Sequence, residues 1–397
     1  MRLSRFLFPL LILFLLVSCS DQPQPHKVGN WQTGKVYNKV SILKDTSLSY
    51  ALYLPNSYKA DEENKIIFLF DAHANGTLPV NKYHALAEKH RIILAASNDS
   101  KNGLSGTARN HIITTFIDDV EQRLDIDKFN MLTGGFSGGA RVASMIGVYN
   151  KNVKGIIGCG AGFPGVQHFK NKEFIWVGIV GNKDFNYLEL KNLYNQFQFD
   201  KIKSYLLVFD GKHEWPPEEV MDEALGIILE GKTDKLKYED KYASVIDPLE
   251  DEEIEKRDML IQSFNSKDLK WWNNEIFKLK NNAKNATTRE VRLMNARLLS
   301  YLGIVCYMFT EKAVKIGNDE ETEKYLKIYE NIEPDNPDMF YFKAVYFAKN
   351  HKNKAALTAL KLSVEHGLDD LSKIKTEKAF SGIRKDPEFK KILAEEK

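Results

Sequence analysis

Between residues 31 and 231, short apolar segments alternate with segments whose apolar residues recur at helical spacing. The segments 65–70 and 92–96 are continuous apolar runs, as expected for strands that are buried on both faces of a parallel sheet. Residues 110–124 have the apolar spacing of an amphipathic helix. This alternation predicts a mostly parallel sheet with helices on both of its faces, which is an α/β architecture. We predict strands at 31–43, 48–54, 65–70, 92–96, 129–133, 155–159, 174–180 and 204–209, and helices at 83–90, 110–124, 188–197 and 216–229, with one further helix directly after residue 137.

The pattern changes at about residue 232. From there to residue 397, charged segments with helical spacing replace the strand signals, which predicts an all-α domain after the α/β domain. Residues 325–371 resemble tetratricopeptide-type helical hairpins, in which small residues such as Ala344 and Ala359 let helices approach closely. A non-repetitive helical bundle is the alternative, and a domain of either kind offers a surface to a protein partner.

One glycine-rich turn lies within the α/β segment. Gly135, Ser137 and Gly139 fit the G-x-S-x-G pattern of a nucleophile elbow, and they lie between a predicted strand and a predicted helix, as that motif requires. A serine on such a sharp turn needs glycine neighbours, and its hydroxyl then lies at a helix N-terminus, where free N–H groups favour negative charge. Outside that context, the same pattern is typical of an ordinary tight strand–helix turn.

An acidic residue and a histidine follow the serine at the ends of later strands. Asp184 comes after the predicted strand 174–180, and His213 comes after the predicted strand 204–209. Because ligand sites in such sheets lie beyond the carboxyl ends of the strands, both side chains should converge on Ser137. We therefore predict Ser137 as the nucleophile, His213 as the general base and Asp184 as the acid that orients it.

The acid and the oxyanion hole have competing assignments. Asp184 precedes a predicted helix and is also suited to cap it. Asp71 is a second carboxylate at a strand end, but it precedes the serine and lies in the loop that should supply an oxyanion donor. We predict an oxyanion hole formed by the backbone N–H of Gly138 and by that of Ala72 or His73.

Residues 45–230 resemble an α/β-hydrolase of the esterase group that includes feruloyl esterases and polyhydroxybutyrate depolymerases. The resemblance is carried by the G-x-S-x-G turn at Ser137 and by residues 211–216, Gly-Lys-His-Glu-Trp-Pro, which are similar to that group's G-x-H-x-W-P motif around its histidine. It implies ester hydrolysis through an acyl-enzyme. The chain departs from the group at residues 71–73, Asp-Ala-His, where those esterases usually carry a His-Gly pair.

Residues 1–19 have the composition of an export signal. Positive residues precede the apolar segment 6–17, and the Leu-Val-Ser-Cys sequence that ends at Cys19 resembles a bacterial lipobox, in which the cysteine is lipidated. Residues 20–30 are polar and contain prolines, as expected for a tether. We expect an exported lipoprotein that is held at a membrane of the cell envelope by its lipid anchor. An ordinary secretory signal or a short membrane anchor is the alternative.

Composition argues against several other classes of function. The formal net charge of +2 gives no electrostatic reason to expect nucleic acid as a partner. No histidines or cysteines stand at metal-ligand spacing, so we expect neither a metal nor another cofactor. Cys159 and Cys306 lie in different predicted domains, which makes a disulfide framework unexpected.

The sequence therefore predicts a membrane-tethered serine hydrolase, more specifically a carboxylic ester hydrolase acting on a small-molecule or polymer-linked ester. A serine peptidase of the same fold is one alternative, and a catalytically silent binding lipoprotein that uses its helical domain is another. The predicted domains are a signal peptide at 1–19, a tether at 20–30, an α/β-hydrolase domain at 31–231 and a tetratricopeptide-like helical domain at 232–397.

Overall fold

The computed structural model describes residues 31–163, 169, 172–241, 243–244, 248–368 and 371–394. Its central element is an eight-stranded sheet with the strand order β1-β2-β4-β3-β5-β6-β7-β8. β2 pairs antiparallel with β1 and β4, and every other described strand pair is parallel. The strands are β1 (Val36–Ser41), β2 (Ser49–Tyr53), β3 (Lys65–Phe70), β4 (Ile92–Ser97), β5 (Met131–Phe136), β6 (Val153–Cys159), β7 (Ile175–Gly181) and β8 (Ser204–Phe209).

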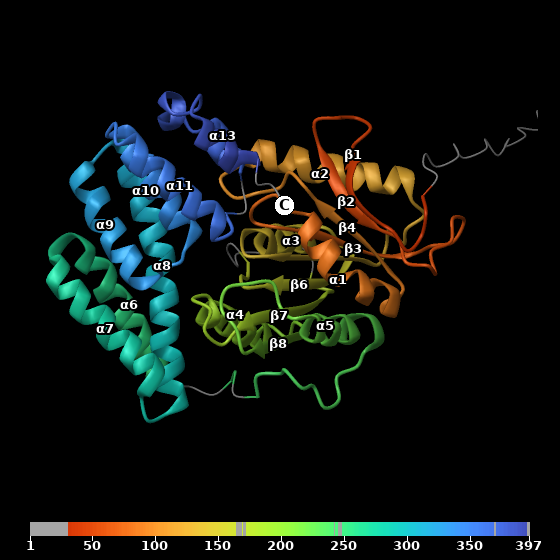
Figure 1. The fold of residues 1–397 in the computed structure, drawn as a ribbon. Helices are drawn as coiled ribbons and strands as arrows, with labels where there is room; N and C mark the ends of the chain where they lie inside the picture. Colours follow the sequence, from red (N-terminus) through yellow and green to blue (C-terminus); the bar gives the residue numbers. More distant parts are fainter. Residues whose placement is uncertain are drawn as a thin grey trace, which may run out of the picture.

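Helices cover both faces of this sheet (Figure 1). Phe116, Val142 and Phe197, from α2, α3 and α4, pack against one face of the sheet. Tyr83 of α1 and Met221 of α5 pack against the other face. The predicted α/β architecture is therefore confirmed, and each predicted strand is present. The helices are α1 (Thr77–His90), α2 (Gly106–Arg123), α3 (Gly138–Tyr149), α4 (Tyr187–Phe199) and α5 (Glu218–Glu230).

β5 extends further than the sequence suggests. It ends at Phe136 instead of residue 133, because Gly134 and Gly135 continue the strand. A Cβ atom at Gly135 would lie 2.6 Å from the carbonyl oxygen of Phe70, so a larger residue does not fit there. Glycine is rare in strands, so strand propensity does not predict the last residues of β5.

The starts of several helices also differ from the prediction, and α2, for example, begins at Gly106 instead of residue 110. α1 begins at Thr77 instead of residue 83. α5 begins at Glu218, and Pro217 is its N-cap residue with an extended ψ of 153°. Pro216 and Pro217 therefore precede α5, whereas the predicted helix 216–229 includes both of them in its first turn.

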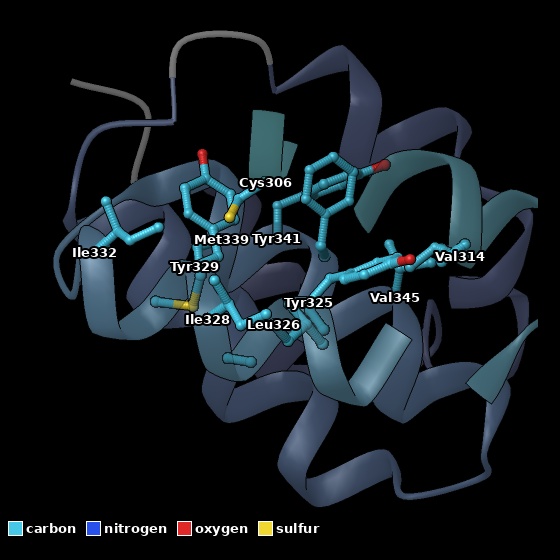
Figure 2. Close-up of a cluster of buried hydrophobic side chains, with 14 of the residues drawn as sticks. Cys306, Val314, Tyr325, Leu326, Ile328, Tyr329, Ile332, Met339, Tyr341 and Val345 are labelled. Carbon is cyan, nitrogen blue, oxygen red and sulfur yellow. The ribbon is translucent and has the colours of Figure 1, made fainter. Parts of the chain in front are cut away.

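From Pro248 onward the described residues form helices that share one apolar core. Figure 2 shows part of this core, in which Tyr325, Tyr329 and Tyr341 pack beside Met339 and Cys306. The predicted all-α region is confirmed, while its assignment to tetratricopeptide-type hairpins remains a prediction. The elements are α6 (Pro248–Ser266), α7 (Leu269–Asn285), α8 (Arg289–Ile316), α9 (Asp319–Ile332), α10 (Pro337–Lys349), α11 (Asn353–Glu365), α12 (Ser372–Thr376), the 3₁₀-helix η1 (Lys378–Gly382) and α13 (Pro387–Ala394).

α8 is the central helix of this layer, which lies beside the sheet in Figure 1. By length and composition alone, α8 is apolar enough to cross a membrane. Its residues Leu298, Leu302 and Cys306 are instead buried against the neighbouring helices. The apolar character of α8 is thus explained by its place in the helical core.

The chain between α5 and α6 pairs with the outer edge of the sheet. The Val208 N–H donates to the carbonyl of Tyr238 at 2.7 Å, and the Asp240 N–H donates to the carbonyl of Leu206 at 2.9 Å. These bonds satisfy backbone groups of β8, which would otherwise be an open edge strand.

A buried histidine joins α1 to α5. The side chain of His90 is 2% exposed, and its Nε2 and Nδ1 atoms lie 2.7 Å from Asp222 and 2.8 Å from Glu230. Lys89 and Lys232 form further ion pairs with the same two carboxylates. Burial by itself raises the pKa of Asp222, but hydrogen bonds from Lys89 and His90 outweigh that effect and hold this pKa below its ordinary value. The folded protein therefore stabilises the ionised form of Asp222.

Asp222→Asn is expected to lower the free energy of unfolding at neutral pH by about 1.5–3 kcal/mol, the usual contribution of a hydrogen bond to a charged group. Because the pKa of Asp222 is lower in the folded chain than in the unfolded one, its contribution is present above about pH 4 and is lost as the pH falls through the folded pKa. Urea unfolding should therefore show a difference between variant and wild type that shrinks as the pH is lowered.

Asp118→Asn provides the matched control. Asp118 pairs with Lys44, and both side chains are more than half exposed. Such a surface pair contributes on the order of 0–1 kcal/mol, so this variant should resemble the wild type at each pH. An equal effect of Asp222→Asn at acidic and neutral pH would contradict the role given to this carboxylate.

Candidate active site

Ser137 connects β5 to α3 in a strained backbone conformation. Its φ is 53° and its ψ is −121°, a combination that residues with side chains seldom adopt. Its N–H donates to the carbonyl of Cys159, at the end of the neighbouring β6, at 2.9 Å. A strained serine between a strand and a helix is the geometry of a nucleophile elbow.

The glycines around Ser137 let three backbone segments meet. A Cβ atom at Gly139 would lie 2.0 Å from the carbonyl oxygen of Phe70, and one at Gly135 would lie 2.4 Å from the carbonyl carbon of Gly139. Side chains therefore fit at neither position, and the ends of β3 and β5 contact the start of α3 directly. Both outer glycines of the G-x-S-x-G pattern thus have a steric cause.

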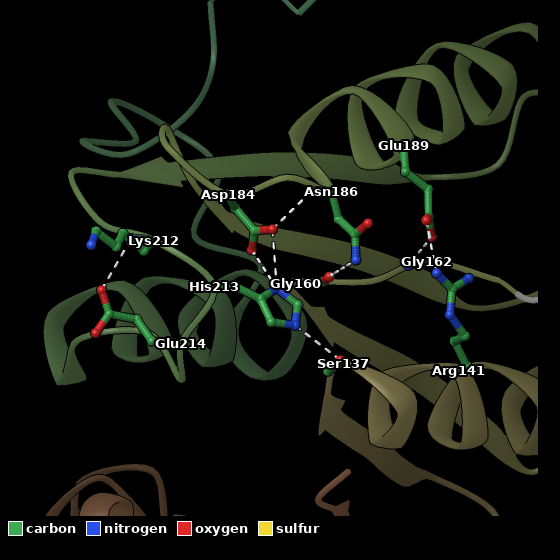
Figure 3. Close-up of polar contacts among 10 residues, drawn as sticks. All are labelled: Ser137, Arg141, Gly160, Gly162, Asp184, Asn186, Glu189, Lys212, His213 and Glu214. Carbon is green, nitrogen blue, oxygen red and sulfur yellow. Dashed lines mark hydrogen bonds and ion pairs between the residues drawn. The ribbon is translucent and has the colours of Figure 1, made fainter. Parts of the chain in front are cut away.

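His213 lies between Ser137 and Asp184, as Figure 3 shows. Its Nε2 atom is 2.9 Å from the Ser137 Oγ atom, and its Nδ1 atom is 2.9 Å and 3.0 Å from the two carboxylate oxygens of Asp184. With the proton on Nδ1, the imidazole donates to Asp184 and accepts from the serine hydroxyl, as a general base must. The structure therefore places the three residues singled out from the sequence in one chain of hydrogen bonds.

Asp184 is 1% exposed and is oriented by its own loop. Its carboxylate accepts the backbone N–H of Asn186 at 2.8 Å, and the side chain of Asn186 donates to the carbonyl of Gly160 at 2.7 Å. The N-cap residue of α4 is Asn186. Asp184 therefore lies before the cap position, with its carboxylate directed at His213.

The imidazole of His213 is enclosed by aromatic rings. The centroid of the ring lies 4.7 Å from that of Phe136 and 4.3 Å from that of Phe185. Gly160 completes the enclosure: its φ is +64°, and a Cβ atom there would lie 3.1 Å from the Nδ1 atom of His213. A side chain at position 160 would thus displace the imidazole.

Asp71, the competing carboxylate, takes part in a different set of contacts. It is 4% exposed, accepts the indole N–H of Trp215 at 2.9 Å and accepts the backbone N–H of His73 at 2.8 Å. Because Trp215 lies two residues after His213, this bond ties the histidine loop to the loop after β3. The tryptophan in the histidine motif thus has a structural role that its position in the sequence does not reveal.

The residues assigned to the oxyanion hole lie on two elements. Gly138 is the first residue of α3, while Ala72 and His73 follow β3. The N–H of His73 donates to Asp71, which makes Ala72 the stronger candidate of that pair. Asn102, which the sequence did not single out, links the two sides: its N–H donates to the carbonyl of Ala72 at 2.9 Å. The side-chain oxygen of Asn102 also occupies the space in which a Cβ atom of Gly138 would lie.

A second polar cluster consists of Arg141, Glu189 and the backbone of Gly162, and Figure 3 shows it together with Ser137, His213 and Asp184. Arg141 donates to Glu189 at 2.7 Å, and the backbone N–H of Gly162 donates to the other carboxylate oxygen of Glu189 at 3.0 Å. These bonds tie the first turn of α3 to α4 and to the loop after β6. No pattern in the sequence marks this cluster, because its members belong to separate elements.

Within the described part of the chain, no group of three or more His, Cys, Asp or Glu side chains is arranged to hold a metal ion. Cys159 and Cys306 are buried free thiols, and burial raises the pKa of each. Cys19, with the predicted signal peptide and the predicted tether, lies outside the described residues. The site thus offers serine, histidine and carboxylate chemistry.

No protein-family model matches the chain, and no curated protein matches its sequence. Solved structures resemble half of it. An S-formylglutathione hydrolase from Staphylococcus aureus covers 50% of this chain and 98% of its own, with 12% identity and a TM-score of 0.41. The feruloyl esterase module from Clostridium thermocellum covers 50% and 86%, with 14% identity and a TM-score of 0.39. An esterase from the archaeon Pyrobaculum calidifontis covers 51% and 87%, with 9% identity and a TM-score of 0.40.

The strand order, the antiparallel β2 and the strained serine after β5 decide the fold. The chain has the α/β-hydrolase fold. In this fold, a serine on the turn after such a strand is positioned for nucleophilic attack. The chemistry of the site itself is supported by its own geometry.

Trp215→Phe is expected to lower the free energy of unfolding by about 1.5–3 kcal/mol beyond the loss of packing, because the buried Asp71 carboxylate loses a hydrogen bond. Trp176→Phe is the matched control, since Trp176 is also buried but its indole N–H has no partner among the described residues. Chemical unfolding of both variants measures the difference. Equal losses in the two variants would contradict the proposed importance of the Trp215–Asp71 bond.

Proposed function

We propose that this protein is a carboxylic ester hydrolase that acts through Ser137, His213 and Asp184. The observation that carries the proposal is the strained Ser137 with its hydroxyl oxygen 2.9 Å from the Nε2 atom of His213. Nucleophile, base and orienting acid are then within hydrogen-bonding distance of one another, which is the requirement for nucleophilic serine catalysis.

The reaction follows from this geometry. The Oγ atom of Ser137 attacks the acyl carbon while His213 accepts the hydroxyl proton through Nε2. Asp184 stabilises the imidazolium that forms. His213 then donates the proton to the departing alcohol, which leaves an acyl group on Ser137. Water, deprotonated by His213, attacks the acyl carbon, and His213 returns the proton to the Oγ atom of Ser137 as the acid is released.

The negative charge of each tetrahedral intermediate needs donors that are already in place. The N–H of Gly138, at the start of α3, is one donor, and the N–H of Ala72 is the second. Loss of one such donor typically costs about 3–4 kcal/mol of transition-state stabilisation. Asn102 is hydrogen-bonded to the carbonyl of Ala72 and packs against Gly138, and it thereby holds the two donors in position relative to each other.

An ester is favoured over a peptide by the motif around His213, which is similar to that of feruloyl esterases and polyhydroxybutyrate depolymerases. The fully assembled hydrogen-bond chain disfavours a catalytically silent binding protein, because a buried Asp184 directed at an imidazole serves no evident purpose in binding alone. A small-molecule or polymer-linked ester is the substrate class that we propose.

Covalent labelling with a fluorophosphonate tests the class of enzyme. The wild type should be labelled, and Ser137→Ala should lose the label, because the nucleophile is gone. Ser144→Ala is the matched control: Ser144 is a buried serine of the same helix α3, and its loss should leave labelling intact. Persistent labelling of Ser137→Ala would remove Ser137 as the nucleophile.

The substrate class is tested with paired acyl esters and acyl anilides of the same acyl group. We expect hydrolysis of the esters and little of the anilides. Comparable hydrolysis of both would favour the peptidase alternative. A wild-type protein that is neither labelled nor active on the panel would favour the binding lipoprotein.

We also propose that Cys19 carries the lipid that holds the protein at a membrane of the cell envelope. The apolar segment 6–17 and the lipobox-like sequence ending at Cys19 support this proposal. Cys19→Ser should abolish incorporation of labelled fatty acid and move the protein from the membrane fraction to the soluble fraction. Unchanged fatty-acid incorporation in this variant would contradict the assignment.

A further inference from the structure

The loop that carries Asp184 contacts the helical layer as well as His213. This acid loop, residues 181–187, joins β7 to α4. Arg297 of α8 reaches it from the helical layer: its Nη1 atom donates to the carbonyl of Asn182 at 3.4 Å, and its guanidinium carbon lies 4.7 Å from the ring centroid of Tyr187. Arg297 therefore contacts the acid loop on both sides of Asp184.

Arg297 is itself held rigidly. Its Nε and Nη2 atoms donate to one carboxylate oxygen of Glu253 on α6, at 2.9 Å and 2.6 Å. Arg257 donates to the other oxygen of Glu253, which is fully buried. A buried ion pair adds little net stability, because desolvation offsets the attraction, but it fixes the direction of a planar guanidinium. Glu253 thus aims Arg297 at the acid loop.

Two further contacts fix the same end of the loop. The hydroxyl of Tyr187 donates to Asp240 at 2.8 Å. Lys191, one turn further along α4 and 4% exposed, forms an ion pair with Glu250 of α6. The ring beneath Arg297 is therefore anchored at its hydroxyl end, and the helix that follows the acid loop is anchored to α6.

We infer that Arg297 is a positioning residue that holds the acid loop, and through it Asp184, in the orientation that His213 requires. The helical layer is then part of the catalytic unit and not only an appended binding module. This inference rests on the proposed function, because it assigns Arg297 to the support of that triad. Without Arg297, Asn182 and Tyr187 lose a common partner, and the acid loop that carries Asp184 is held less firmly against the imidazole.

Arg297→Met tests the inference in the full-length protein, with Arg257→Met as the matched control. Both arginines pair with the buried Glu253, but Arg257 lies over Tyr301 within the helical layer instead of reaching the acid loop. We expect Arg297→Met to lower kcat on an ester by about 10- to 100-fold with little change in KM, because small misplacements of catalytic groups have effects of that size. Arg257→Met should keep kcat close to that of the wild type.

Proton NMR gives a readout that a purely structural role would not move. The proton shared by the Nδ1 atom of His213 and Asp184 should give a downfield resonance in the wild type and in Arg257→Met. In Arg297→Met this resonance should shift upfield or broaden. Arg297→Lys keeps a positive charge beside Glu253 and serves if Arg297→Met does not fold; its kcat should lie between those of Arg297→Met and the wild type.

Three outcomes overturn the inference. The first is an unchanged kcat in the Arg297 variants, and the second is an equal loss of kcat in the Arg297 and Arg257 variants. The third is an unaltered resonance in folded Arg297→Met, or in folded Arg297→Lys if Arg297→Met does not fold. Failure of the proposed function would differ, because the wild type would then show neither fluorophosphonate labelling nor ester turnover. In that case, the resonance of the His213–Asp184 proton still decides whether Arg297 positions Asp184.

Discussion

The close approach of three backbone segments at Ser137 is the constraint on which the site depends. The carbonyl of Phe70 at the end of β3 comes so near Gly139 that no side chain fits, and this places α3 directly over the strand ends. Ser137 must then adopt its strained φ and ψ to connect β5 to α3. Such strain persists only where the surroundings fix it, and here they fix it with the serine hydroxyl beside His213.

Two buried carboxylates, one after β3 and one after β7, show that the hydrogen-bond partner of a carboxylate decides its role. Asp184 and Asp71 are similar in burial and in position at the sheet edge. Asp184 accepts a hydrogen bond from the Nδ1 atom of an imidazole whose Nε2 atom can take the hydroxyl proton of Ser137. Asp71 accepts from the indole N–H of Trp215, which cannot act as a base. Residue type and position alone therefore do not distinguish Asp184, the catalytic candidate, from Asp71. The group that donates a hydrogen bond to each carboxylate does distinguish them.

The fold, and the three residues that the structure brings together at Ser137, could be predicted from the sequence because those signals are local. Apolar runs predicted the strands, and parallel strands bring residues such as Asp184 and His213 to one edge whatever their separation in the chain. The Asp71–Trp215 bond, the Asn102 contact with Gly138 and the Arg297 contact with Asn182 join residues that are distant in sequence, so no periodicity marks them. The end of β5 was missed because its steric need for glycine overrides strand propensity.

Buried charged residues lie at the junction between the α/β part of the chain and the helical layer. Glu253, Arg297 and Lys191 are each less than one tenth exposed. The Lys191–Glu250 pair and the contacts of Arg297 with Asn182 and Tyr187 join the two parts in one specific geometry, even though such pairs add little net stability. The helical layer is therefore better described as a fixed support than as a mobile arm. A support that holds the acid loop gives the helical layer a role beside the proposed hydrolase site, independent of any partner that its outer surface binds.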